Sequence, residues 1–241
     1  MDATNKRSFF IFITGLVLVT GLLFGVWFFL GRAHTLNEPG FPADHKLECV
    51  SYTPLIDDET PYDLGDNYQI PLSRFDQDFA LLSQRFSCVR LYIMKGYEAV
   101  PLLAKKYNLK MILSAWIGTD EEKNQAEISA LIQTAREYQD QVLFVLVGNE
   151  VLLRREQTEG QMINCVKQVK QALPQIPVSY AEVLGFWRFY KKLADEVDFL
   201  TIHILPYWDD NARSVDEARE HLRFSIAYAH EQFPDKKFYV G

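Results

Sequence analysis

The sequence has little that would indicate a metal centre or a disulfide framework. It contains only three cysteines, Cys49, Cys88 and Cys165, and their spacing does not match that of metal ligands. Cys49 and Cys88 lie at the beginning of predicted strands, and Cys165 lies on the apolar face of a predicted helix. We therefore expect all three to be small buried hydrophobic residues rather than ligands, nucleophiles or members of a disulfide framework.

Signals for nucleotides, nucleic acids and cofactors are also lacking. No Gly-x-Gly-x-x-Gly or Walker-type loop follows any predicted strand, so nothing indicates a nucleotide site. The net charge of −7 argues against nucleic acid as a partner. The sequence has no low-complexity segment and no short repeat, and no motif predicts a metal or an organic cofactor.

An apolar run without charges extends from Phe9 to Leu30. Its length of about 22 residues is sufficient to cross a hydrocarbon core of about 30 Å, and longer than a secretory apolar region of about 7–15 residues. No small-x-small cleavage site follows it, and it lacks the polar stripe of a soluble helix. We interpret 1–8 as a short tail, 9–30 as a retained membrane span and 31–46 as a linker.

The charges that flank this run give only a weak orientation signal. Lys6 and Arg7 precede it, and Arg32 and His34 follow it. We predict a single-pass membrane protein whose N-terminus is cytoplasmic. The domain at 47–241 would then be extracytoplasmic, in the periplasm or at the cell surface.

From residue 47 onward, apolar β-branched and aromatic runs alternate with patterns of helical spacing. Such alternation is typical of parallel strands joined by crossover helices. The seven runs predict an α/β fold, a (β/α)8 TIM-type barrel that is incomplete at its C-terminal end; the alternative is an open doubly wound sheet. The predicted strands are Leu47–Tyr52, Cys88–Tyr92, Lys110–Trp116, Val142–Asn149, Ile176–Ala181, Asp198–Leu205 and Lys237–Gly241.

Three helix starts can be proposed from the sequence. Thr158 with Gln161 and Ser214 with Glu217 have the spacing of capping boxes. Ser73 is a candidate cap for a helix with an apolar stripe, which consists of Phe75, Phe79, Leu82 and Phe86.

The run Val142–Asn149 has the composition of a strand that is buried on both faces. Glu150 follows it directly. A carboxylate at the C-terminal end of a buried parallel strand occupies the place where barrel enzymes keep their catalytic residues. The alternative is that Glu150 is an ordinary acidic residue in the first turn of the next helix.

Polar and aromatic residues also occur at the ends of the other predicted strands. In a barrel these ends face one mouth, and aromatic planes with carboxylates and an amide suit a sugar. Purely structural roles stay open as well: Arg90 as a structural arginine, His203 as a core histidine, and the tryptophans as rim packing. The candidate substrate-binding residues are Tyr52, Arg90, Tyr92, Trp116, Asn149, Glu182, Trp187, His203, Tyr207 and Trp208.

Several of these segments resemble glycoside hydrolase family 17, the β-1,3-glucanases and related glucan transglycosylases. The resemblance covers essentially all of 47–241, with blocks in the same order, and it is nearest to the bacterial branch. The most specific block is the Gly-Asn-Glu-Val element at the end of the fourth strand. The blocks are Cys88–Tyr92, Val147–Val151, Ala181–Trp187, Thr201–His203 and Ile204–Trp208.

The resemblance implies a (β/α)8 barrel that acts on β-glucan with retention of anomeric configuration. By position, it implies that Glu150 is the general acid/base and that Asn149 binds near the reacting sugar, at its 2-hydroxyl. A retaining enzyme needs a second carboxylate about 5–5.5 Å from the first, and one of the two must be protonated to assist the leaving oxygen.

The sequence departs from the family pattern at the nucleophile. In the family this is a glutamate at the end of the seventh strand, and here the sequence stops at Gly241, one residue before it. Glu182 is a conceivable substitute, but it lies on the strand next to Glu150. We expect the chain as written to have the acid/base without the nucleophile and to be inactive. Transglycosylation of β-glucans, or a catalytically dead glucan-binding module, are the alternatives to hydrolysis.

Overall fold

The computed structural model describes residues 3–32, 45–56, 59, 70–208 and 213–241. The chain divides into two compact units, Met1–Asp44 and His45–Gly241. Most of the predicted linker, and the first two residues of the predicted tail, lie outside the described residues. The two units are described separately below.

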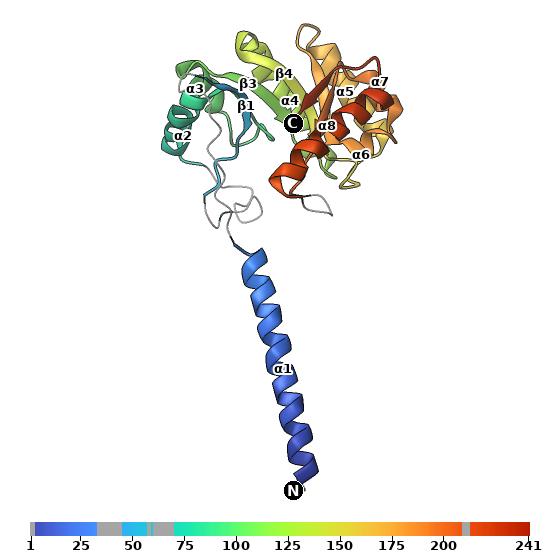
Figure 1. The fold of residues 1–241 in the computed structure, drawn as a ribbon. Helices are drawn as coiled ribbons and strands as arrows, with labels where there is room; N and C mark the ends of the chain where they lie inside the picture. The colour runs from blue at the N-terminus through green and yellow to red at the C-terminus, as the bar shows by residue number, and fades with distance from the viewer. Residues whose placement is uncertain (1–2, 33–44, 57–58, 60–69, 209–212) are drawn as a thin grey trace. The chain divides into compact units, whose positions relative to one another are not determined.

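The first unit contains one helix, α1, at Ala3–Leu30 (Figure 1). Its segment Lys6–Leu30 has a mean hydropathy of 2.5, and none of the apolar window is buried. Among the described residues it is the one helix that is long and apolar enough to cross a membrane. A signal sequence near the N-terminus can meet the same criterion, so this observation fits both an anchor and a signal.

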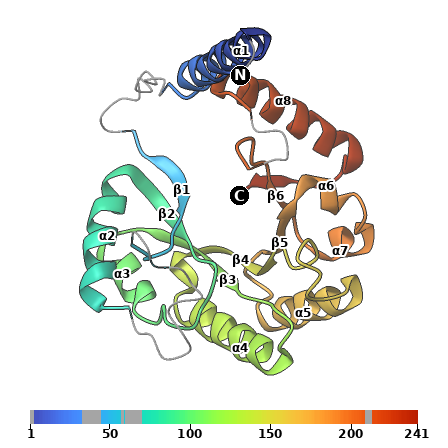
Figure 2. The same cartoon turned by 90° about the horizontal axis from the view of Figure 1, so that it is seen from below.

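The second unit is built on seven parallel strands that pair in sequence order, β1 to β7. Figure 2 shows the strands curving around a centre, with the helices on the outer side. This arrangement confirms the predicted incomplete TIM-type barrel rather than an open doubly wound sheet. The strands are β1 Leu47–Ser51, β2 Phe86–Arg90, β3 Lys110–Ala115, β4 Val142–Asn149, β5 Val178–Val183, β6 Leu200–His203 and β7 Phe238–Val240.

The connections between strands are helical. Each predicted strand overlaps an observed one, and β4 has the predicted bounds. The connecting elements are α2 Leu72–Arg85, α3 Val100–Lys106, α4 Glu121–Glu137, the 3₁₀ helix η1 Gln139–Gln141, α5 Glu159–Ala172, α6 Leu184–Trp187, α7 Lys191–Glu196 and α8 Val215–Gln232.

Two of the three predicted helix starts are confirmed. Thr158 with Gln161 and Ser214 with Glu217 form capping boxes at the starts of α5 and α8. The prediction for Ser73 is wrong: α2 begins at Leu72, directly after a proline whose ring fixes a helical φ. Phe86, predicted as the end of that apolar stripe, belongs to β2.

The inner strands β2 to β6 bury side chains on both of their faces, as the continuous apolar runs predict, whereas the edge strands β1 and β7 are only partly buried. The outer face packs on the helices in the main core, which includes Phe79 of α2, Leu131 of α4 and Val166 of α5. The inner face forms a second cluster of alternating strand residues, which consists of Cys88, Ile112, Phe144, Leu146 and Ala181, with Cys49, Phe199 and Tyr239 packed against it. Residue parity along each strand therefore determines whether a side chain faces the helices or the barrel interior.

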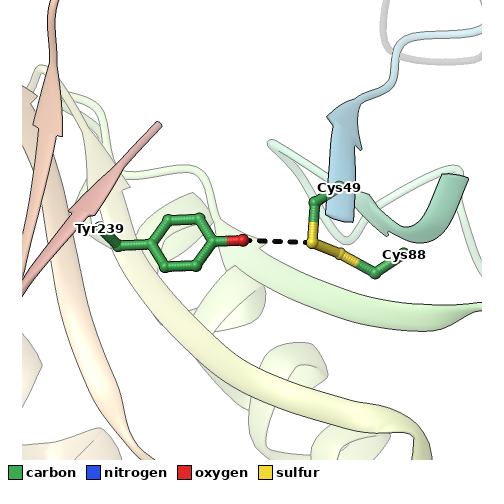
Figure 3. The surroundings of a disulfide bond; sticks show 3 residues. All are labelled: Cys49, Cys88 and Tyr239. Atoms are coloured by element: carbon green, nitrogen blue, oxygen red, sulfur yellow. Dashed lines mark hydrogen bonds between the residues drawn. A yellow bond between two sulfur atoms is a disulfide. The ribbon is translucent and has the colours of Figure 1, made fainter. Parts of the chain in front are cut away.

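Within the described residues, the sheet has β1 at one edge and β7 at the other. A groove of about 480 Å³ lies between these two strands, and its lining includes Arg90 and Ile112 from the neighbouring inner face. The hydroxyl of Tyr239 in β7 spans it to contact Sγ of Cys49 in β1, at 3.2 Å (Figure 3).

One prediction about the cysteines is wrong, because Cys49 and Cys88 form a disulfide (Figure 3). The register of β1 on β2 pairs these two residues directly and places their Cα atoms 4.4 Å apart, within the range that a disulfide spans. The sequence could not reveal this pairing, since it depends on the register of two strands separated by a helix. Cys165 is a free buried cysteine, as predicted.

We expect the disulfide to stabilise the barrel, because it closes a loop with a sequence separation of 39 residues. A disulfide that closes a loop of this length typically raises the free energy of unfolding by about 2–4 kcal/mol. Replacing Cys49 and Cys88 with serine should lower the stability measured by urea unfolding, whereas Cys165→Ser should not remove this contribution. Thiol labelling of the unfolded, non-reduced protein should modify one cysteine, and modification of all three before reduction would contradict the disulfide.

Candidate active site

Four side chains from three strands and one loop form a continuous hydrogen-bonded chain at the C-terminal end of the barrel. Nη2 of Arg90, at the end of β2, donates to Oδ1 of Asn149 at 2.7 Å. Nη1 of Arg90 lies 3.3 Å from Nε2 of His203, at the end of β6. Nδ1 of His203 lies 2.5 Å from Oε1 of Glu150. Residues that are up to 113 positions apart are thereby brought to one point, as the parallel barrel predicts.

The partners of His203 determine which ring nitrogen carries the proton. Arginine has no acceptor, so Nε2 of His203 must accept from Arg90. The neutral imidazole then carries its proton on Nδ1 and donates it to the carboxylate of Glu150. This hydrogen bond is the main cause that lowers the pKa of Glu150; the positive charges of Arg154 and Arg90 also lower it, while partial burial opposes them. In the free protein Glu150 is therefore held ionised.

Arg90, which lies at the centre of this set of hydrogen-bonded side chains, is almost fully buried, with 4% of its surface exposed. Burial lowers the pKa of Arg90, and the neighbouring Glu150 and Tyr92 oppose this. Its guanidinium also lies over the ring of Tyr92, with 4.7 Å between Cζ and the ring centroid. Arg90 thus bridges an amide and an imidazole.

The turn that presents Glu150 has an unusual backbone. Gly148 has a φ of +89°, and a Cβ there would lie 2.7 Å from Cγ2 of Val151. Glu150 itself has a φ of +54°, which is uncommon for a residue with a side chain. The pairing of β4 with β5 shifts register between Leu146 and Asn149, which is how the strand turns its last residues toward the mouth.

Glu182 lies beneath this turn rather than in the open mouth. Its surface exposure is 0%, and its carboxylate accepts from the Tyr180 hydroxyl and from the backbone N–H groups of Leu153 and Val183. Burial raises its pKa, and these three donors oppose the rise. In this structure its carboxylate faces protein donors, although the sequence analysis assigned it to substrate binding.

Two other predicted mouth residues are turned into the core. The hydroxyl of Tyr52 donates to Asp78 at 2.7 Å and its ring packs against Phe75 and Phe79 of α2, so it lies on the helix side of the sheet. Burial raises the pKa of Tyr52. Trp187 is fully buried, and its Nε1–H donates to the carbonyl of Thr201 at 3.1 Å. The structure does not bring these two side chains to the cluster around Glu150.

The remaining predicted aromatics keep accessible surface. Tyr207 and Trp208, which follow β6, are 73% and 79% exposed, and their rings meet edge to face with centroids 5.3 Å apart. Trp116, which follows β3, is 38% exposed, and the guanidinium of Arg154 lies over its ring at 4.3 Å. These exposed faces could pack against sugar rings.

Two residues that support the site were not predicted from the sequence. Arg154 donates to the carbonyl oxygens of Asn149 and Ile117, which ties the loop after β4 to the loop after β3. Glu127 of α4 is buried and accepts from the backbone N–H groups of Met94, Lys95 and Trp116. Glu127 lies within the apolar stripe of its helix, and a polar residue there was the available signal. Arg154 has no comparable signal.

No candidate metal site is found in the part of the chain that the structure describes, since no group of three or more His, Cys, Asp or Glu side chains is placed to hold an ion. The chemistry that the described cluster can perform is proton transfer at Glu150 and hydrogen bonding from Arg90, Asn149 and His203.

Comparison with known proteins gives consistent results. A model of the BtgE/BtgC glycoside hydrolase domain matches residues 49–241. A glucan 1,3-beta-glucosidase of Arthroderma benhamiae is 25% identical over 171 residues, which cover 67% of this chain and 54% of that protein. The chain therefore spans about half the length of that relative.

Solved structures share the fold. An active-site mutant of Rhizomucor miehei beta-1,3-glucanosyltransferase, in complex with laminaritriose, has a TM-score of 0.67 and 21% identity, over 80% of this chain and 69% of that one. A beta-D-glucuronidase of Dictyoglomus thermophilum has a TM-score of 0.59 and 15% identity, over 81% of this chain and 35% of that one. At these identities the likeness shows the barrel fold.

The lowered pKa of Glu150 predicts a pH dependence of stability. The pKa of Glu150 in the folded state lies below the ordinary value of 4.5. The contribution of the ionised carboxylate to the free energy of unfolding is therefore complete above about pH 4.5, and it is lost as the pH falls through the lower folded-state pKa. The difference in unfolding free energy between wild type and Glu150→Gln, measured in urea from pH 7 to pH 3, should therefore decrease toward acid pH. A difference that is constant over this range would contradict the His203–Glu150 hydrogen bond.

Proposed function

The chain belongs to the BtgE/BtgC glycoside hydrolase domain family, and we propose that it cleaves or transfers β-1,3-glucan with Glu150 as the general acid/base. The family match covers the whole barrel, and the resemblance to glycoside hydrolase family 17 is confirmed at this level. The observation that carries the proposal is the position of Glu150, directly after β4 and joined to Asn149 through His203 and Arg90.

The surroundings of Glu150 support both halves of an acid/base cycle. As a base, the ionised carboxylate that His203 stabilises is the form that takes a proton from an attacking water or sugar hydroxyl. As an acid, Glu150 must first be protonated. Partial burial already raises its pKa against the effect of His203, and a bound sugar that excludes water would strengthen this effect. Substrate binding would thus shift Glu150 toward the acid form.

A retaining reaction also needs a nucleophilic carboxylate about 5–5.5 Å from the acid/base. We propose the C-terminal end of β7 as the place where it would lie. The amide of Gly241 donates to the carbonyl of Ile202 at 3.0 Å, and a Cβ at this position would meet Nη1 of Arg90 and Cδ2 of His203. The backbone at the end of β7 therefore reaches the same cluster as Glu150. The glycosyl-enzyme that would form is common to hydrolysis and transglycosylation, which differ in whether water or a sugar accepts it.

We also propose that the barrel is held at a membrane by the segment 9–30 and lies outside the cytoplasm. Two observations support this. α1 is long and apolar enough to span a bilayer. The disulfide between Cys49 and Cys88 suits an oxidising compartment, because cytosolic thiols are kept reduced.

In a protein that also carries the nucleophilic carboxylate, Glu150→Gln should abolish most turnover of laminari-oligosaccharides, because the amide cannot donate a proton to the leaving oxygen. We expect a loss of at least about 100-fold in kcat, in the range typical of a general acid. Glu231→Gln, which changes an exposed carboxylate on α8, is the matched control and should retain wild-type turnover. Retained turnover in Glu150→Gln would remove Glu150 from the mechanism.

Trp208→Ala should weaken the binding of laminari-oligosaccharides while circular dichroism shows an unchanged fold. The loss of one sugar-stacking plane corresponds to roughly 1 kcal/mol, or about fivefold in Kd by calorimetry. Phe224→Ala is the control, because Phe224 is also an exposed aromatic residue, 70% accessible, but lies on α8. Equal affinities for wild type and Trp208→Ala would identify Trp208 as a residue without a part in binding.

A further inference from the structure

Two buried polar side chains of β5, Tyr180 and Glu182, are not part of the proposed chemistry, yet both bind the loop that carries Glu150. The hydroxyl of Tyr180 accepts from the backbone N–H of Leu152 at 3.0 Å and donates to Oε2 of Glu182 at 2.5 Å. Oε2 of Glu182 also accepts from the backbone N–H of Leu153 at 3.2 Å. Both side chains have 0% exposure, so this pair is inaccessible to solvent.

We propose that Tyr180 and Glu182 are positioning residues that fix the turn after β4, so that the carboxylate of Glu150 is held against His203. The proposal rests on the acid/base role proposed for Glu150 and adds the residues through which β5 controls its geometry.

The turn requires such support because its backbone is strained. Glu150 has a positive φ, which is unfavourable for a residue with a side chain. The conformation persists only where surrounding contacts fix it. The amide of Glu150 donates to the carbonyl of Ala181 at 2.8 Å, which holds the near side of the turn to β5. Tyr180 and Glu182 hold the far side, through the amides of Leu152 and Leu153.

The chemistry of the pair fits this role better than a role in binding or catalysis. All partners of the Glu182 carboxylate are donors: one hydroxyl and the amides of Leu153 and Val183. Such a set suits an ionised acceptor that holds loop amides in place. Tyr180 packs edge to face on Trp187, with ring centroids 5.4 Å apart, so the hydroxyl is fixed from the helix side.

The charge environment of Glu150 gives a readout of the turn's position. Glu150 faces His203 from β6, Arg90 from β2 and Arg154 from its own loop, and all three lower its pKa. Glu182 of β5 is the neighbouring carboxyl group, and burial, with a smaller effect from Glu150, raises its pKa. If the turn loosens, Glu150 moves away from His203, and its pKa should rise toward the ordinary value.

Tyr180→Phe is the test variant, because it removes the hydroxyl and keeps the ring that packs on Trp187. Ser179→Ala is the matched control: Ser179 is also fully buried on β5, but its hydroxyl bonds the carbonyl of Phe199 and the hydroxyl of Thr201, not the loop. The pKa of Glu150 is measured by NMR titration of ¹³Cδ-labelled glutamate, with its resonance assigned through Glu150→Gln.

We expect Tyr180→Phe to raise the pKa of Glu150 and to speed amide hydrogen exchange at Leu152 and Leu153, while Ser179→Ala changes neither. An unchanged Glu150 titration in folded Tyr180→Phe, or an equal shift in Ser179→Ala, would overturn the proposal. If Tyr180→Phe does not fold, exchange in wild type decides: protection of both amides supports the proposal, and exchange at unprotected rates overturns it.

A kinetic measurement separates this inference from the proposed function. With laminari-oligosaccharides, Tyr180→Phe should reduce kcat by roughly 10- to 100-fold and leave KM nearly unchanged, because a misplaced acid/base affects the transition state more than binding. A change confined to KM would contradict the positioning role. If a wild-type protein that also carries the second carboxylate shows no turnover, the proposed function fails, while the titration of Glu150 still decides whether the pair positions the turn.

Discussion

The buried guanidinium of Arg90 is the group on which the geometry of the site depends. It donates to Asn149 after β4 and to His203 at the end of β6, and so joins three strands that are not neighbours in the sheet. Because arginine only donates, it also forces His203 to carry its proton on the nitrogen that faces Glu150. A lysine here could not bridge both partners with the same planar geometry.

The protonation state of Glu150 follows from a balance between its hydrogen-bonded and charged partners and its burial by the surrounding protein. The hydrogen bond from His203 and the charges of Arg154 and Arg90 favour the carboxylate, whereas desolvation favours the neutral acid. Because Glu150 is only partly buried, the site is open to a ligand that would complete its desolvation. The free protein and a sugar complex would therefore differ in protonation as well as in contacts. The turn that carries Glu150 sets its distance from His203, and β5 contacts this turn through Ala181, Tyr180 and Glu182.

Much of this arrangement is predictable from sequence, for physical reasons. Strands that are buried on both faces have continuous apolar runs, so β4 and its terminal Glu150 could be located directly. Several features that the sequence does not show depend on register. Whether Tyr52 and Glu182 face the barrel interior or the helices depends on strand parity, which a shift of one residue reverses. The pairing of Cys49 with Cys88 depends on register in the same way. The contacts of Arg154 and Tyr180 join side chains to loop backbone, and such contacts leave no periodic pattern.

The measurement that most directly tests the central claim is a crystal structure of Glu150→Gln with a bound laminari-oligosaccharide. We expect a sugar chain across the C-terminal ends of the strands, with one glycosidic oxygen within about 2.6–3.2 Å of the substituted side chain at position 150. We also expect sugar hydroxyls within hydrogen-bond distance of Asn149. A well-ordered oligosaccharide bound elsewhere on the barrel, with no glycosidic oxygen near position 150, would contradict the assignment of Glu150 as the acid/base.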